Sequence, residues 1–185
     1  MFYSGKNNLI TDVDGILVGN AEDKEIGTGT TILIPPIGST AGADVRGGAP
    51  GTREVGALNP YNLVDTIDAI VLSGGSAWGL EAASSAANYI GKNGRGFKTS
   101  ENIKNVPMVP AAILFDLNNG GNKDWGDESP YNNLGIKAST RASEEFELGN
   151  FGAGYGAKAG SLKGGLGSAS FENEEGLKIG GLFAV

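Results

Sequence analysis

Glycine is the feature that most constrains what this chain can fold into: 32 of its 185 residues are glycine, and they stand between short apolar runs. Glycine adopts backbone conformations that other residues avoid and lets two backbones approach closely, so turns and tight contacts are expected at these positions. The glycines follow no strict period, which excludes collagen. The length then predicts one compact domain over residues 1–185, built from many short elements.

The charge and the missing residue types narrow the function classes. A formal net charge of −7 argues against nucleic acids and anionic membranes as partners. No stretch is apolar and long enough to span a bilayer, and the first residues do not resemble a signal peptide, so we expect a cytoplasmic protein. The chain has neither Cys nor His. It therefore cannot build a thiol nucleophile, a Ser-His-Asp triad or the usual zinc site, and we expect no metal and no cofactor.

The apolar runs predict a layered α/β protein with a mixed or antiparallel sheet. We expect a helix from the cap Ser76 to about residue 90, with Gly91 after it, and a second helix from Ser129-Pro130 to about residue 146. Strands are expected at residues 28–34, 66–72 and 111–116, a strand or tight hairpin at 9–18, and a hairpin formed by 164–171 and 177–185. Residues 39–58, 118–128 and 152–161 are expected to be loops.

A strand, a glycine turn and a helix start meet in LSGGSAWGLEAA, residues 72–83. At such a place the backbone N–H groups of Gly74, Gly75 and Ser76 and the helix dipole can face an anion. The anion could be a phosphate or the oxyanion of an acyl-transfer transition state. The motif is not a P-loop and does not match the dinucleotide fingerprint. A tight turn without any ligand is the alternative.

Two further loops carry candidate residues. In ADVRGGAPGTRE, residues 43–54, Arg46 and Arg53 could clamp a carboxylate, with Asp44 and Glu54 as internal partners; the alternative is a solvated loop held by its own ion pairs. The glycines of GNFGAGYGAKAGSLKGG, residues 149–165, allow a close backbone approach or make a flexible loop. Its two lysines, at positions 158 and 163, are expected to be solvated, although a desolvated lysine could act as a base.

Taken together and in this order, the motifs DVRGGAPGTRE, LSGGSAWGL, VPMVPAAILFDL, GNFGAGYGAKAG and KGGLGSAS resemble the DmpA family of self-processing aminopeptidases. That family includes L-aminopeptidase/D-esterases, β-aminopeptidases and nylon-oligomer hydrolases. The resemblance runs from TDVDGILVGN to the end of the chain. It implies a precursor that cuts itself once into an α chain and a β chain, which stay together in an αββα sandwich and assemble into oligomers. This chain then resembles the α-chain portion, incomplete without the β-chain portion.

The resemblance also implies where the chemistry lies. The nucleophile, a Ser or Thr at the start of the β chain, would come after Val185, so this chain would hold no catalytic residue and would be inactive alone. Trp78 stands where relatives carry a Tyr beside the oxyanion, and Ser161 stands where relatives often carry a Lys. The implied substrate is a short peptide or amide, and the implied partners are the β-chain portion and further copies of the αβ unit.

Three other interpretations remain open from the sequence. The chain could be a truncated or non-catalytic member of the family. It could be a phosphate- or nucleotide-binding α/β domain that uses residues 74–76. It could also be a structural, glycine-rich β module, which the two expected helices argue against.

Overall fold

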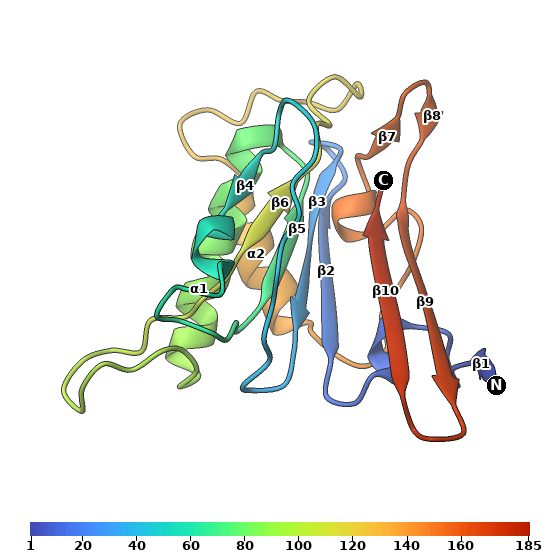
Figure 1. Cartoon of the computed structure of the whole chain (residues 1–185). Coiled ribbons are helices and arrows are strands. Elements are labelled where there is room, and N and C mark those ends of the chain that lie inside the picture. The colour runs from blue at the N-terminus through green and yellow to red at the C-terminus, as the bar shows by residue number, and fades with distance from the viewer.

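A computed structural model describes all residues, 1–185, and arranges them in three layers (Figure 1). Helices α1 (Glu81–Lys92) and α2 (Tyr131–Thr140) cover one face of a five-stranded sheet, and a three-stranded sheet lies on its other side. The five-stranded sheet has the order β2 (Leu17–Asp23), β3 (Thr28–Ile34), β5 (Ile70–Ser73), β6 (Ala111–Ile113), β4 (Thr52–Arg53). The three-stranded sheet has the order β1 (Phe2–Ser4), β9 (Leu166–Asn173), β10 (Lys178–Ala184).

The larger sheet is mixed. Strands β5 and β6 run parallel and are connected through α1, whereas every other pair in the two sheets is antiparallel. The remaining elements are the small hairpin β7 (Lys158–Ala159) and β8 (Leu162–Lys163) and four 3₁₀ turns: η1 (Ile10–Asp12), η2 (Val55–Leu58), η3 (Ser76–Leu80) and η4 (Gly152–Gly154). The order helix, sheet, sheet confirms the layered α/β prediction and supplies three layers of an αββα sandwich.

The main core lies between the two helices and the five-stranded sheet. Helix α1 buries Ala82, Ala83 and Ala86, which are all fully enclosed. Helix α2 approaches it so closely that a Cβ added at Gly135 would lie 2.4 Å from the carbonyl oxygen of Ala82. Small residues on α1 therefore allow close helix–helix contact as well as contact with the sheet.

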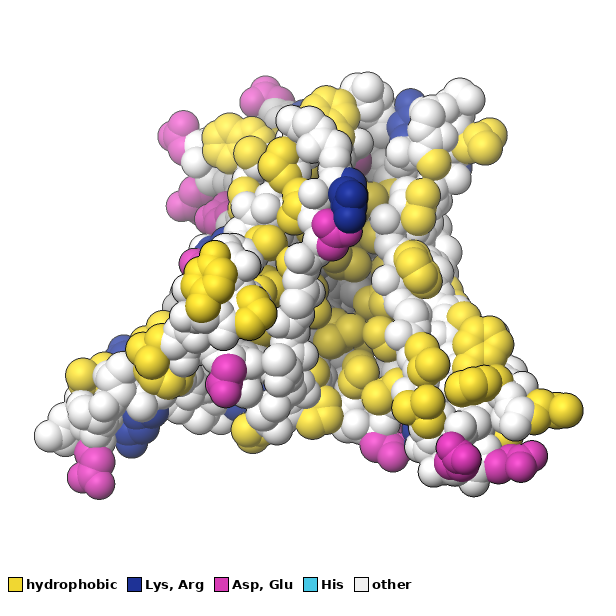
Figure 2. All heavy atoms as spheres, viewed as in Figure 1, with side chains coloured by type: hydrophobic (Ala, Val, Ile, Leu, Met, Phe, Trp, Pro, Cys, Tyr) yellow, Lys and Arg dark blue, Asp and Glu magenta, His cyan; other side chains and the backbone are white.

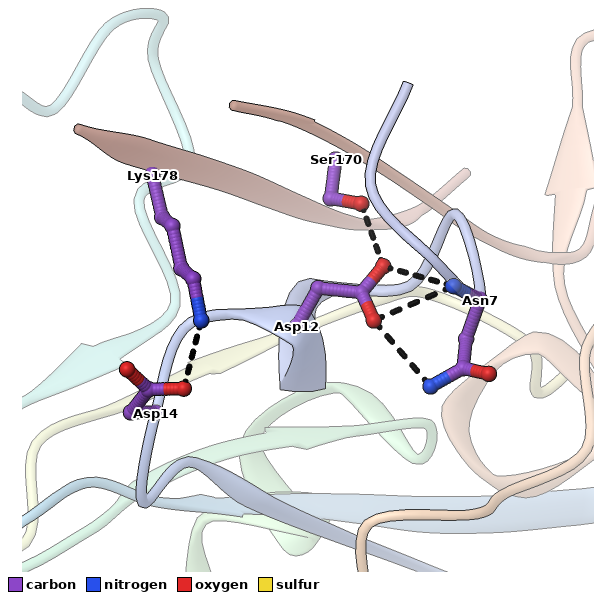
Figure 3. A network of polar contacts seen from close by, with 5 residues as sticks. All are labelled: Asn7, Asp12, Asp14, Ser170 and Lys178. Atoms are coloured by element: carbon purple, nitrogen blue, oxygen red, sulfur yellow. Dashed lines mark hydrogen bonds and ion pairs between the residues drawn. The ribbon is translucent and has the colours of Figure 1, made fainter. Parts of the chain in front are cut away.

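The three-stranded sheet is joined to the N-terminal segment through polar contacts (Figure 3). The Asp12 carboxylate accepts hydrogen bonds from the Asn7 backbone N–H at 3.1 Å and from the Ser170 hydroxyl at 2.6 Å. Lys178 pairs with Asp14 at 2.6 Å. Burial would raise the pKa of Asp12, but the hydrogen bonds from Ser170 and the loop amides outweigh it, and the pKa is lowered.

The predicted strand at 28–34 is confirmed, because β3 spans those residues and ends at a Pro-Pro pair. The C-terminal hairpin is confirmed as β9 and β10. The predicted strand or hairpin at 9–18 is wrong, since Asp12 gathers the local amides into η1 and β2 begins only at Leu17. The second helix ends at Thr140, six residues early, and α1 continues through Gly91. No helix in the structure has the length and apolarity that crossing a membrane requires.

Candidate functional site

The motifs at the end of β5, after β6 and around η4 meet at one buried carboxylate, that of Asp116. Its Oδ1 accepts the N–H of Gly75 at 2.7 Å, and its Oδ2 accepts the hydroxyl of Thr28 at 2.6 Å. The Thr28 oxygen also lies 3.2 Å from the hydroxyl of Tyr131. Thr28 has one hydroxyl hydrogen and donates it to the carboxylate, so Tyr131 must be the donor to Thr28. All three side chains are fully buried.

Glycine is required where the backbone surrounds this network. A Cβ added at Gly74 would lie 2.0 Å from Asp116 Oδ2, and one at Gly156 would lie 2.5 Å from the same oxygen. A Cβ at Gly75 would lie 2.1 Å from Cζ of the Tyr131 ring. The glycines of the GGS turn and one glycine of the GAGYG loop are thus explained by close packing around the carboxylate and the ring.

The backbone N–H groups of the GGS turn are all used inside the protein. Gly74 donates to the Gly29 carbonyl at 2.9 Å, Gly75 donates to Asp116, and Ser76 donates to the Leu114 carbonyl at 3.0 Å. In the structure none of these three amides is left free for an anion. Their role toward a phosphate or an oxyanion stays a prediction.

Ser76 does not cap a helix through its side chain. Its φ of 53° lies in the left-handed region, which non-glycine residues seldom adopt. The tight turn holds it there, between the buried Gly75 and the exposed Trp78. The prediction of Ser76 as a helix cap is wrong because the α-helix itself starts only at Glu81, after the turn η3.

Trp78 connects the surface to the buried network. The residue is 57% exposed, and its indole packs edge-on against Trp125, with ring centroids 6.0 Å apart. Trp125 in turn packs edge-on against Tyr131, also at 6.0 Å. Burial raises the pKa of Tyr131, which keeps its hydroxyl protonated as the donor that Thr28 needs. Trp78 also lines a hollow of about 740 Å³ that holds the carboxylates of Glu81, Asp127 and Glu128.

Arg46 lies in an exposed loop and forms an ion pair with Asp44 at 2.8 Å, as predicted. Arg53 instead donates to the hydroxyl of Ser84 on α1. Glu54 forms no ion pair, so its predicted role as an internal partner is wrong. Arg46 borders a mostly apolar hollow of about 360 Å³ between its loop and strands β5 and β6.

Ser161 borders a separate hollow of about 620 Å³, together with Lys158 and Lys163. The Lys163 ammonium donates to the carbonyls of Gly154 at 2.9 Å and Gly164 at 2.8 Å. Burial lowers the pKa of Lys163. Lys158 and Lys163 are both exposed, as expected, and the Lys163 ammonium is in addition held by two backbone carbonyls.

The predicted site residues therefore divide into groups. Gly74, Gly75, Ser76 and Trp78 lie together along one turn, whereas Arg46 and Ser161 border two other hollows. Sequence reasoning missed the network of Asp116, Thr28 and Tyr131. The available signal was an acidic residue placed directly after the apolar run AAILF.

Comparison with known proteins places these features in a family. The model of peptidase family S58 matches residues 8–185. An uncharacterized aminopeptidase of Mycobacterium tuberculosis is 41% identical over 186 residues, which are 96% of this chain and 52% of that protein. A 6-aminohexanoate-oligomer endohydrolase of Kocuria sp. is 30% identical, over 86% of this chain and 41% of that protein.

Solved structures show the same fold. The L-aminopeptidase D-Ala-esterase/amidase of Ochrobactrum anthropi, described as a variant of the Ntn hydrolase fold, superposes with a TM-score of 0.71 at 20% identity. The match covers 91% of this chain and 49% of that one. The chain spans about half the length of the curated relatives it matches. With its matching motifs, fold and family model, this chain belongs to peptidase family S58, the DmpA family.

Proposed function

We propose that this chain is the N-terminal, α-chain portion of a self-cleaving serine or threonine aminopeptidase or amide hydrolase that acts on short peptides or amides. One observation carries the proposal: the chain belongs to this family, and the outer face of its three-stranded sheet is left uncovered. The relatives' names, aminopeptidase and 6-aminohexanoate-oligomer endohydrolase, support amide bonds as the substrate class.

The outer face of this sheet is apolar and open to solvent (Figure 2). Phe171 and Ile179 are directly paired across β9 and β10 and share one face with Phe183, four residues further along β10. These residues are 52%, 52% and 63% exposed. Contiguous apolar faces of this kind mark contact surfaces. We propose that the β-chain portion covers this face and completes the αββα sandwich, and that αβ units form homo-oligomers.

The proposed chemistry needs a nucleophile from outside this chain. A freed N-terminal Ser or Thr supplies a hydroxyl together with an α-amine that can act as its base. An α-amine has an ordinary pKa of about 7.7–8.0, so part of it is neutral near pH 7. This solution needs no histidine, and the chain has none. A cytoplasmic location stays a prediction from the sequence.

The test compares this chain with the complete protein that contains it, using amino-acid p-nitroanilides. We expect turnover by the complete protein, none by residues 1–185 alone, and none after the proposed Ser or Thr nucleophile is replaced by Ala. Clear turnover by this chain alone would overturn the proposal. An inert complete protein, or a stop codon directly after Val185, would favour the non-catalytic or truncated alternative.

A further inference from the structure

A hollow of about 620 Å³ next to η4 has a cationic wall that the proposed chemistry does not use. We call it the lysine hollow: it is bordered by Lys24 from the β2–β3 turn and by Lys158 and Lys163 from the β7–β8 hairpin. Asn119, from the loop after β6, also lines it. Glu25 is the only acidic residue in its wall, so the lining holds three positively charged residues and one negatively charged residue.

Lys163 is held in a fixed position in this wall. Its ammonium group has three N–H donors, and two of them bind the carbonyls of Gly154 and Gly164 at 2.9 and 2.8 Å. No carboxylate lies within ion-pair distance of it. Burial lowers the pKa of Lys163, as expected for a partly desolvated cation without a counter-ion. One donor and the full charge thus remain available to a ligand.

The other two lysines are also available. Neither Lys24 nor Lys158 forms a side-chain hydrogen bond or an ion pair in the structure, and both are exposed. Glu25 is engaged by the side-chain amide of Asn122 at 3.3 Å. The hollow is therefore lined by one lysine held by two carbonyls and by two exposed lysines without ion-pair partners, which favours binding of an anion.

We propose that the lysine hollow binds a carboxylate of the substrate, so that the complete enzyme prefers short peptides or amides with a free carboxylate over the same compounds with that carboxylate amidated. This specificity rests on the proposed function. A monoanion fits better than a phosphate dianion, because the hollow also holds groups that repel negative charge. The Gly154 and Gly164 carbonyls bind Lys163, and the Glu25 carboxylate lies in the wall. A carboxylate accepts charge-assisted hydrogen bonds from ammonium groups.

The experiment measures kcat and KM of the complete protein for a dipeptide with a free carboxylate and for its C-terminal amide. We expect the free acid to be preferred, and Lys163→Gln to lower kcat/KM for the free acid about tenfold, the loss of one hydrogen bond to a charged group. The loss should appear in KM with kcat unchanged, because the contact binds the ground state and the transition state alike. Lys163→Arg should restore most of the preference.

Two further variants separate binding from structural damage. Lys158→Gln touches no hydrogen bond of the fold and should also reduce the preference for the free acid. Lys137→Gln, at an exposed position on α2 away from the hollow, should leave it unchanged. Equal kcat/KM for acid and amide in the unaltered protein, or equal losses for both substrates in the Lys158 and Lys163 variants, would overturn the inference.

The two proposals fail in different ways. If the complete protein hydrolyses neither substrate, the proposed function fails, and a calorimetric titration with N-acetylglycine then decides on the lysine hollow alone. Saturable binding that Lys158→Gln weakens supports it, and no binding refutes it. If hydrolysis proceeds without any preference for the free acid, the function stands and the lysine hollow is refuted.

Discussion

Replacing Thr28 by Val tests the network around Asp116 most directly. Val has nearly the same shape but no hydroxyl, so the Asp116 carboxylate loses the donor at 2.6 Å and the Tyr131 hydroxyl loses the acceptor at 3.2 Å. Both groups are fully buried, and water cannot replace the missing partner. A buried polar group left without its partner costs about 1–3 kcal/mol, more when charged. The free energy of unfolding should therefore fall by about 4 kcal/mol.

The assay is guanidinium unfolding followed by tryptophan fluorescence. Trp78 and Trp125 are the only tryptophans of the chain, and Trp125 packs against Tyr131, so the signal reports on this region. Thr30→Val is the matched control, because Thr30 is equally buried in the same strand but bonds the neutral hydroxyl of Ser73 at 2.8 Å. We expect it to cost about 1–2 kcal/mol. If the two variants lose the same free energy of unfolding, the buried Asp116 carboxylate does not make the Thr28 hydrogen bond more important than the neutral one of Thr30.

Three further predictions concern other positions. Gly75→Ala should lower the unfolding temperature strongly, because its φ is +89° and the new Cβ would lie 2.1 Å from Cζ of Tyr131; differential scanning calorimetry measures this. The pKa of Asp12 is lowered in the fold, so its carboxylate stabilises the protein fully above the ordinary pKa of 3.8, and this stabilisation is lost as the pH falls below that value. In Asp12→Asn, the midpoint of urea unfolding should therefore depend less on pH over that acidic range. Arg46→Ala should change the unfolding free energy by less than about 1 kcal/mol, since its pair with Asp44 is exposed; chemical unfolding checks it.

Local patterns predicted those elements whose ends are set by nearby residues. The run of β-branched residues that stops at Pro35 predicts β3 with its correct bounds. The C-terminal hairpin was recognisable for a similar reason, since its polar turn separates two apolar runs. The strand expected at 66–72 is shorter in the structure, where β5 spans Ile70–Ser73, because tertiary contacts hold the residues before it. Asp68 accepts the Met108 backbone N–H at 2.8 Å, and the regular strand begins only at Ile70.

The turn at Gly75 and Ser76 shows why the site was harder to predict. When only local geometry is considered, a glycine pair before a helix predicts free backbone N–H groups that can bind an anion. The occupant of that turn is Asp116, about forty residues away in the sequence, which accepts the Gly75 N–H. Nothing local reveals such a long-range pairing, and the same holds for Tyr131, whose ring fills the space beside Gly75.

The pairing of β1 with β9 has a consequence for how the chain folds. Phe2 lies opposite Asn173, so strand β1 has its only partner, β9, far along the sequence. The five-stranded sheet and its helices can form earlier, whereas the second sheet must wait until the hairpin of β9 and β10 has left the ribosome. Closing so long a loop is slow because many contacts must form across a large sequence separation. The N-terminal strand should therefore be the last part of this chain to become protected from proteolysis.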